Sequence, residues 1–190
     1  DIRKGAATDR IEDALNYKAV AKRLIAFVED YLAAHGIAST RVPNAQGDKA
    51  SLYATIGPNV EGGVVLSAHS DVVPTAHQTW TSDPFTLTER DGRLFGRGTS
   101  DMKGFLACVL AYAPAFARAQ LNEPVHLCFS YDEEVGCLGV QKLLAPLLQR
   151  EVRPVAAIIG EPTGMEVINA HKGKLSMRAD VTGFACHSAY

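Results

Sequence analysis

Short apolar runs alternate with longer helical segments along most of this 190-residue sequence, and this alternation constrains the fold more than any other feature. Five runs have the length and bounding turn residues of strands: 37–43, 50–57, 62–70, 125–131 and 155–160. Three longer segments predict helices: 9–35, where apolar residues recur at three-to-four spacing, then about 103–119 and 138–150. This order predicts an α/β fold with a mixed, mostly parallel sheet and helices on both faces.

The segment from Lys174 to Gly183 departs from this pattern. Apolar and polar residues alternate there one by one, which predicts a strand with one face in water. We therefore expect residues 1–178 to form the main α/β domain and residues 179–190 to begin a second domain.

Composition narrows the class of protein. With 47% hydrophobic residues, the chain can bury a substantial core. Its 19 basic and 21 acidic residues interleave without the basic stripe that nucleic acid or an anionic membrane requires. No apolar run approaches the ~20 residues of a membrane span, and the N-terminus lacks the apolar stretch of a secretory signal. We expect a cytoplasmic protein that acts on a small molecule.

Imidazole and carboxylate side chains follow three of the predicted strands, and another carboxylate precedes a predicted helix. The set comprises His69, Asp71, Asp101, Asp132, Glu133, Glu134 and Glu161. In an open parallel sheet, ligands bind at the carboxyl ends of the strands. We therefore expect these side chains to converge at one edge of the sheet.

A cluster of this kind predicts a dinuclear metal site. Neighbouring carboxylates repel one another and raise one another's pKa values unless cations neutralise them. A mixed set of His, Asp and Glu is the ligand chemistry of zinc, cobalt or manganese. Asp71 has the spacing of a carboxylate that orients the His69 imidazole. Of the adjacent Glu133 and Glu134, one can bind metal while the other takes a proton from water.

Four motifs in the order SAHSDVVP, GRGTSDMKG, YDEEVG and GEPT carry a resemblance to a known family. The chain resembles the two-zinc metallopeptidases that include acetylornithine deacetylase, succinyl-diaminopimelate desuccinylase, aminoacylase and glutamate carboxypeptidase. The stretch EPTGMEVINAHKGKLSMRADVTGFACHSAY most resembles the acetylornithine deacetylases. The resemblance implies a zinc-aminopeptidase-like catalytic domain that binds two zinc ions, with cobalt as a substitute.

Residue roles follow from the same resemblance. It implies that His69 and Glu161 hold one zinc ion, that Glu134 helps to hold the other, and that Asp101 bridges both.

Further roles come from the rest of the matched motifs. The resemblance makes Glu133 the general base and Asp71 the carboxylate that orients His69. His187 matches a histidine of an inserted dimerisation domain, which in several members reaches the partner subunit's active site; the alternative is a polar residue at a strand end. Residues 179–190 would begin that domain, and full-length relatives are homodimers.

The resemblance also extends to the backbone and to residues beyond the chain. It implies a cis bond between Asp101 and Met102. In the family a last histidine ligand follows the inserted domain, beyond the position of Tyr190, so the 190-residue chain is expected to have little activity alone.

The implied reaction is hydrolysis of an N-acylated amino acid, in particular removal of the acetyl group from N-acetylornithine in arginine biosynthesis. Desuccinylation, general N-acyl-amino-acid hydrolysis and dipeptide cleavage stay open as alternatives. From another class, a catalytically silent metal-binding module also stays open.

Overall fold

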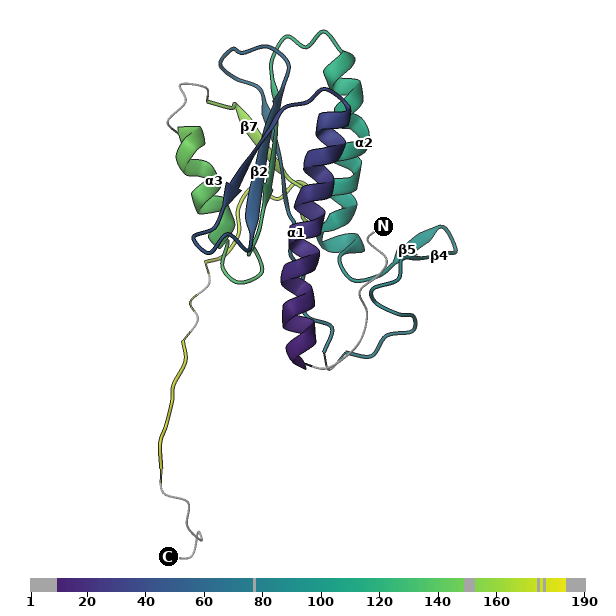
Figure 1. The fold of residues 1–190 in the computed structure, drawn as a ribbon, viewed down its shortest axis with the longest axis vertical. Coiled ribbons are helices and arrows are strands. Elements are labelled where there is room, and N and C mark those ends of the chain that lie inside the picture. The colour runs from purple at the N-terminus through teal and green to yellow at the C-terminus, as the bar shows by residue number, and fades with distance from the viewer. Residues whose placement is uncertain (1–9, 77, 149–152, 174, 176, 184–190) are drawn as a thin grey trace, which may run out of the picture.

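The computed structural model describes residues 10–76, 78–148, 153–173, 175 and 177–183, without the side chains of residues 10–21, 146 and 147. Its helices are α1 (Arg10–Ala34), α2 (Gly104–Arg118) and α3 (Leu138–Leu148), and an irregular turn, η1 (Thr99–Lys103), leads into α2. Its strands are β1 (Ser39–Pro43), β2 (Ala50–Ile56), β3 (Val64–His69), β4 (Thr88–Arg90), β5 (Arg93–Phe95), β6 (Val125–Ser130) and β7 (Ala156–Ile159). All three predicted helices and the five predicted strands are therefore present (Figure 1).

Five strands form one mixed sheet in the order β1-β2-β6-β3-β7. Strand β3 pairs in parallel with β6 and with β7. On the other side, β2 pairs antiparallel with β6 and with β1. The mixed α/β sheet is thus confirmed. Because β6, β3 and β7 run in the same direction, their carboxyl ends meet at one edge of the sheet.

Helices cover both faces of this sheet, as predicted (Figure 1). The alternation of side chains along β2 shows the two layers, since Leu52 and Ala54 face α1 and α2 while Tyr53 faces α3. Leu143 of α3 packs with Tyr53 and Cys128 on the second face. The larger cluster on the first face includes Leu24, Ile25, Val28, Leu32, Met102, Leu106, Val109, Leu110, Ala113, Leu127 and Phe129. None of the helices in the described part of the chain is long and apolar enough to cross a membrane.

A short hairpin of β4 and β5 was not predicted. Its two-residue turn is Asp91–Gly92, and both residues have positive φ values, 52° and 69°. Asp-Gly is the residue pair that such a tight hairpin turn favours. The signal was present in the sequence, but strands of three residues are too short to show alternation.

The strand predicted at residues 174–183 is wrong for the part of it that the structure describes. Residues 175 and 177–183 adopt no regular structure. Leu175, Met177 and Val181 are 81%, 85% and 92% exposed, so neither face of this segment is covered. An alternating pattern becomes a strand only when a neighbouring strand supplies hydrogen bonds, and among the described residues none lies beside this segment.

Candidate metal centre

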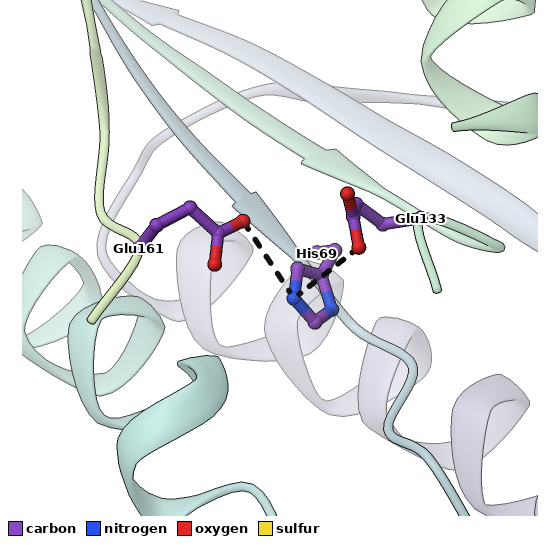
Figure 2. Close-up of side chains that lie close together, drawn as sticks. All are labelled: His69, Glu133 and Glu161. Atoms are coloured by element: carbon purple, nitrogen blue, oxygen red, sulfur yellow. Dashed lines mark ion pairs between the residues drawn. The ribbon is translucent and has the colours of Figure 1, made fainter. Parts of the chain in front are cut away.

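The candidate site lies at the edge of the sheet where the parallel strands end. His69 is the last residue of β3 and pairs in register with Ser130, the last residue of β6. Glu161 is the second residue after the end of β7, and Asp101 lies in η1. Figure 2 shows the side chains of Glu133 and Glu161 converging on His69 from two sides. The predicted convergence of these groups is therefore present in the structure.

The His69 ring is buried and makes a contact at each nitrogen. Its Nδ1 lies 2.9 Å from the main-chain carbonyl oxygen of Asp71, so Nδ1 carries the proton and donates it. Its Nε2 faces the cluster, 2.9 Å from Asp101 Oδ1, 3.8 Å from Glu161 Oε1 and 4.0 Å from Glu133 Oε2. When the ring is neutral, this arrangement leaves the Nε2 lone pair directed at the carboxylates, as metal binding requires.

Two groups of three residues bring their donor atoms within 4.8 Å of one another, and His69 belongs to both. One group adds Glu133 and Glu161, and the other adds Asp101 and Glu134. Zinc bonds to nitrogen and oxygen are about 2.0–2.2 Å long, so ligands of one ion lie within about 4 Å of each other. The donor set is therefore suited to metal, with a spacing slightly wider than one bound ion would impose, and both groups share the Nε2 atom of His69. The first group differs from the predicted one because it contains Glu133, the predicted base, instead of Asp101.

Titration of the cluster reflects its density of negative charge. Burial disfavours the charged form of His69, but Asp71, Asp101 and Glu161 outweigh it and raise the pKa of His69 to about 9. Burial, together with the repulsion of neighbouring carboxylates, raises the pKa of Glu134 and of Glu161 above the usual 4.5. The protein without metal thus neutralises part of its charge with protons, in the place where a cation would do so.

Asp71 holds two parts of the site together. Its main-chain carbonyl accepts the Nδ1 proton of His69, while its carboxylate oxygen Oδ1 lies further from that nitrogen, at 3.5 Å. The carboxylate accepts the main-chain N–H groups of Glu133 and Glu134, both at 3.1 Å. Burial opposes ionisation of Asp71, but the hydrogen bonds from His69 and from these two N–H groups lower its pKa. The main chain of Asp71 thus makes the shorter contact with the His69 ring, and its carboxylate fixes the segment of the two glutamates.

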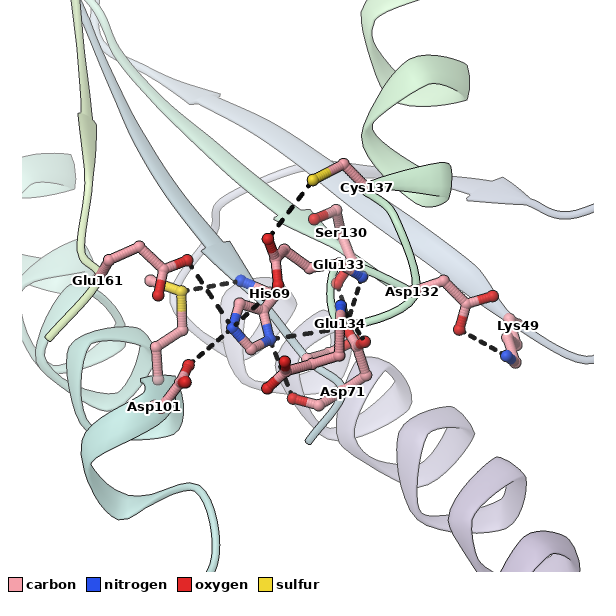
Figure 3. Close-up of polar contacts among 12 residues, drawn as sticks. Lys49, His69, Asp71, Asp101, Ser130, Asp132, Glu133, Glu134, Cys137 and Glu161 are labelled. Carbon is pink, nitrogen blue, oxygen red and sulfur yellow. Dashed lines mark hydrogen bonds and ion pairs between the residues drawn. The ribbon is translucent and has the colours of Figure 1, made fainter. Parts of the chain in front are cut away.

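Several residues around the site were not found from the sequence. The buried Met102 accepts the main-chain N–H of His69 at its Sδ, 3.3 Å away. Lys49 forms an ion pair with Asp132 at 2.5 Å (Figure 3). The thiol of Cys137 donates to Glu133 Oε1 at 3.4 Å. These contacts could not be predicted from the sequence, because the fold brings the partners together and no motif contains both of them.

Two further predictions concern single positions. The bond between Asp101 and Met102 is cis, as the resemblance implied. His187 lies outside the described residues, so its role remains a prediction.

Comparison with known proteins agrees with this geometry. The profile of Peptidase family M20/M25/M40 matches residues 65–185, which is more than half of the chain. Acetylornithine deacetylase of Proteus mirabilis (strain HI4320) is 43% identical over 148 residues, covering 78% of this chain and 37% of the relative. Acetylornithine deacetylase of Pasteurella multocida (strain Pm70) is 37% identical over 169 residues, covering 88% of this chain and 43% of the relative. The chain thus spans about two fifths of the length of these curated relatives.

Among solved structures, human carnosine dipeptidase 1 superposes with a TM-score of 0.65 and 25% sequence identity, covering 80% of this chain and 35% of that one. The sequence profile, the relatives and the fold point to the same group of metallohydrolases. The chain belongs to peptidase family M20/M25/M40.

Proposed function

We propose that the protein is a zinc-dependent amidohydrolase that removes the acetyl group from N-acetylornithine. In this proposal His69, Asp101, Glu134 and Glu161 hold two zinc ions. The observation that carries it is the convergence of these four side chains with Glu133 at one edge of the sheet. The substrate is suggested by relatives named acetylornithine deacetylase, which are 37–43% identical to this chain.

The proposed reaction adds water across the amide bond. The oxygen of water joins the acetyl carbon, the bond from that carbon to nitrogen breaks, and acetate and ornithine leave. Zinc, when bound, would lower the pKa of water and polarise the carbonyl group. Glu133 accepts a proton from water at its carboxylate and returns it to the departing amine nitrogen. Its carboxylate is about one third exposed, so water can reach it.

The remaining residues keep the donors in place. His69 presents Nε2 to the cluster because its Nδ1 proton is held by the main chain of Asp71. The Asp71 carboxylate fixes the main chain of Glu133 and Glu134, so the proposed base and a proposed ligand share one anchor. As part of the same proposal, residues 179–190 begin a dimerisation domain to which His187 belongs.

A second candidate is a dipeptidase, favoured by the superposition on human carnosine dipeptidase 1. That neighbour is 25% identical to this chain, against 43% for the deacetylase of Proteus mirabilis. The difference in identity favours the deacetylase, because the substrate pocket changes more readily than the metal ligands.

Hydrolysis assays with added zinc test the proposal. The chain is offered N-acetylornithine, N-succinyl-diaminopimelate and carnosine, with His69→Ala as the matched control. Because the chain alone is expected to have little activity, we expect slow turnover, with N-acetylornithine cleaved at least about tenfold faster than the others. We expect His69→Ala to cleave none of them, because it lacks a ligand. Preference for carnosine would establish the dipeptidase instead. Zinc binding without cleavage of any of the three would leave a metal-binding module.

A further inference from the structure

The ion pair between Lys49 and Asp132 lies beside the candidate metal centre and joins positions 83 residues apart in the sequence. Lys49 Nζ donates to Asp132 Oδ1 at 2.5 Å, and the two side chains are only 16% and 15% exposed. Neither residue belongs to the two groups of potential metal ligands. The pair is therefore shielded from water but takes no direct part in the proposed chemistry.

Asp132 is the residue directly before the two glutamates, and its backbone conformation is unusual. Its φ is 55°, in the left-handed region that Asp tolerates better than most residues. Figure 3 shows its side chain pointing away from His69 toward Lys49, while Glu133 and Glu134 point into the cluster. The turn at Asp132 thus directs the Asp132 carboxylate toward Lys49 and the carboxylates of Glu133 and Glu134 toward His69.

The segment that carries the glutamates is held from both of these sides. On the side of the metal centre, the Asp71 carboxylate accepts the N–H groups of Glu133 and Glu134. On the opposite side, Lys49 binds the Asp132 carboxylate. The main-chain N–H of Leu138 also donates to the carbonyl oxygen of Asp132, at 3.0 Å, which closes the loop at the start of α3.

Lys49 is itself fixed by the turn between β1 and β2. The side-chain oxygen Oδ1 of Asn44 accepts the main-chain N–H of Lys49 at 3.2 Å. The main-chain N–H of Asn44 donates to the carbonyl oxygen of Lys49 at 2.9 Å. Because β2 begins at the next residue, the lysine is anchored to the central sheet.

We propose that the Lys49–Asp132 ion pair is a positioning device that holds Glu133 and Glu134 in the orientation needed to bind and use metal. This inference rests on the proposed metal-dependent function. Contacts outside the ligands typically change metal affinity by about 10- to 100-fold when removed. The Lys49–Asp132 ion pair is shielded from water and holds the residue directly before Glu133, so it acts on the two glutamates through the main chain.

Cobalt titration of the chain, followed by visible absorption, tests this inference without any assay of activity. Lys49→Met removes one charge, and Asp132→Asn removes the other while keeping a residue that tolerates a positive φ. We expect each variant to bind cobalt about 10- to 100-fold more weakly than the unchanged chain. The double variant should be no weaker than the single ones, because both remove the same interaction. Lys49→Arg, which keeps the charge, should restore most of the affinity.

The matched control is the ion pair between Arg41 and Glu29, whose side chains are both 36% exposed and which ties β1 to α1. Arg41→Met should leave cobalt affinity unchanged, and melting of each variant without metal shows that it folds. Affinity equal to that of the unchanged chain in both Lys49→Met and Asp132→Asn overturns the inference, and so does an equal loss in Arg41→Met. If the unchanged chain binds no cobalt, or His69→Ala binds it equally well, the proposed metal site itself has failed.

Discussion

His69 is almost completely buried, yet four carboxylates lie within 4.0 Å of its ring nitrogens. Burial alone would keep the imidazole neutral, but Asp71, Asp101 and Glu161 together raise its pKa to about 9. A proton on Nε2 and a metal ion on Nε2 therefore exclude each other. The environment that holds the proton in the metal-free protein is the environment that would hold a cation.

This competition predicts how the stability of the metal-free protein depends on pH. The pKa of His69 is 6.5 in the unfolded chain and about 9 in the folded one, so its contribution is complete below pH 6.5 and disappears as the pH rises through 9. The raised pKa values of Glu134 and Glu161 act in the same direction from pH 4.5 upward. In contrast, the lowered pKa of Asp71 contributes stability at neutral pH, and this contribution is lost only as the pH falls below about 3.8. We expect the free energy of unfolding in a chelator to fall by up to about 3 kcal/mol between pH 6.5 and 9.

Chemical denaturation at several pH values measures this loss. His69→Gln removes the titrating group, so its stability should change much less between pH 6.5 and 9 than that of the unchanged chain. An equal slope in both proteins would assign the pH dependence to other groups.

Glu133 is predicted to act as a base more than as a ligand. Glu133→Gln keeps the size of the side chain but cannot accept a proton, so turnover should fall by about 100- to 10,000-fold. Its zinc affinity, measured by titration calorimetry, should stay close to that of the unchanged chain. Because Glu133 groups with His69 and Glu161 in this structure, the opposite result has a clear meaning. A loss of zinc binding as complete as in His69→Ala would make Glu133 a ligand.

At the scale of the elements, the packing of α2 against the end of β7 places Glu161. A Cβ atom at Gly160 would lie 2.0 Å from the ring of Phe105, a residue in the first turn of α2. Gly160→Ala must therefore displace the ring or the segment that carries Glu161. We expect the free energy of unfolding to fall by about 1–3 kcal/mol, and zinc affinity to fall with it.

Thermal or chemical unfolding and zinc titration measure both effects. Gly173→Ala is the matched control, since no atom lies within 4 Å of a Cβ there, and it should change stability by less than about 0.5 kcal/mol. Unchanged stability and zinc affinity in Gly160→Ala would show that this contact does not position Glu161.

The sequence allowed the elements and the main side chains of the site to be predicted because both follow local rules. Apolar runs and helical spacing indicated the sheet and its helices, and the carboxyl-end rule brought His69, Glu133 and Glu161 together. The partners of Asp132 and Met102 could not be predicted, because contacts such as Lys49–Asp132 depend on the strand order. The predicted strand at 174–183 failed for a related reason, since alternation shows which face is apolar but not whether a partner strand is present.

At the scale of the whole molecule, the strands of the sheet that form the core are buried, whereas one strand that leads to the site is exposed. β2 and β6 are buried between helices on both faces, whereas every residue of the edge strand β7 is exposed. Glu161 therefore reaches the site from the least buried strand of the sheet, while His69 comes from the neighbouring interior strand β3. Metal that binds both residues would tie β7 to β3 and stabilise the folded state in proportion to how far its concentration exceeds the dissociation constant.

Zinc titration by calorimetry on the unchanged chain and on His69→Ala tests the central claim, that these side chains form a metal site, most directly. The account predicts that the unchanged chain binds zinc and releases protons as it does so, because His69 must lose its proton on binding. It also predicts that His69→Ala loses the tighter binding step, while Arg41→Met keeps it. Absence of zinc binding in the unchanged chain, or equal affinity in His69→Ala, would contradict the account.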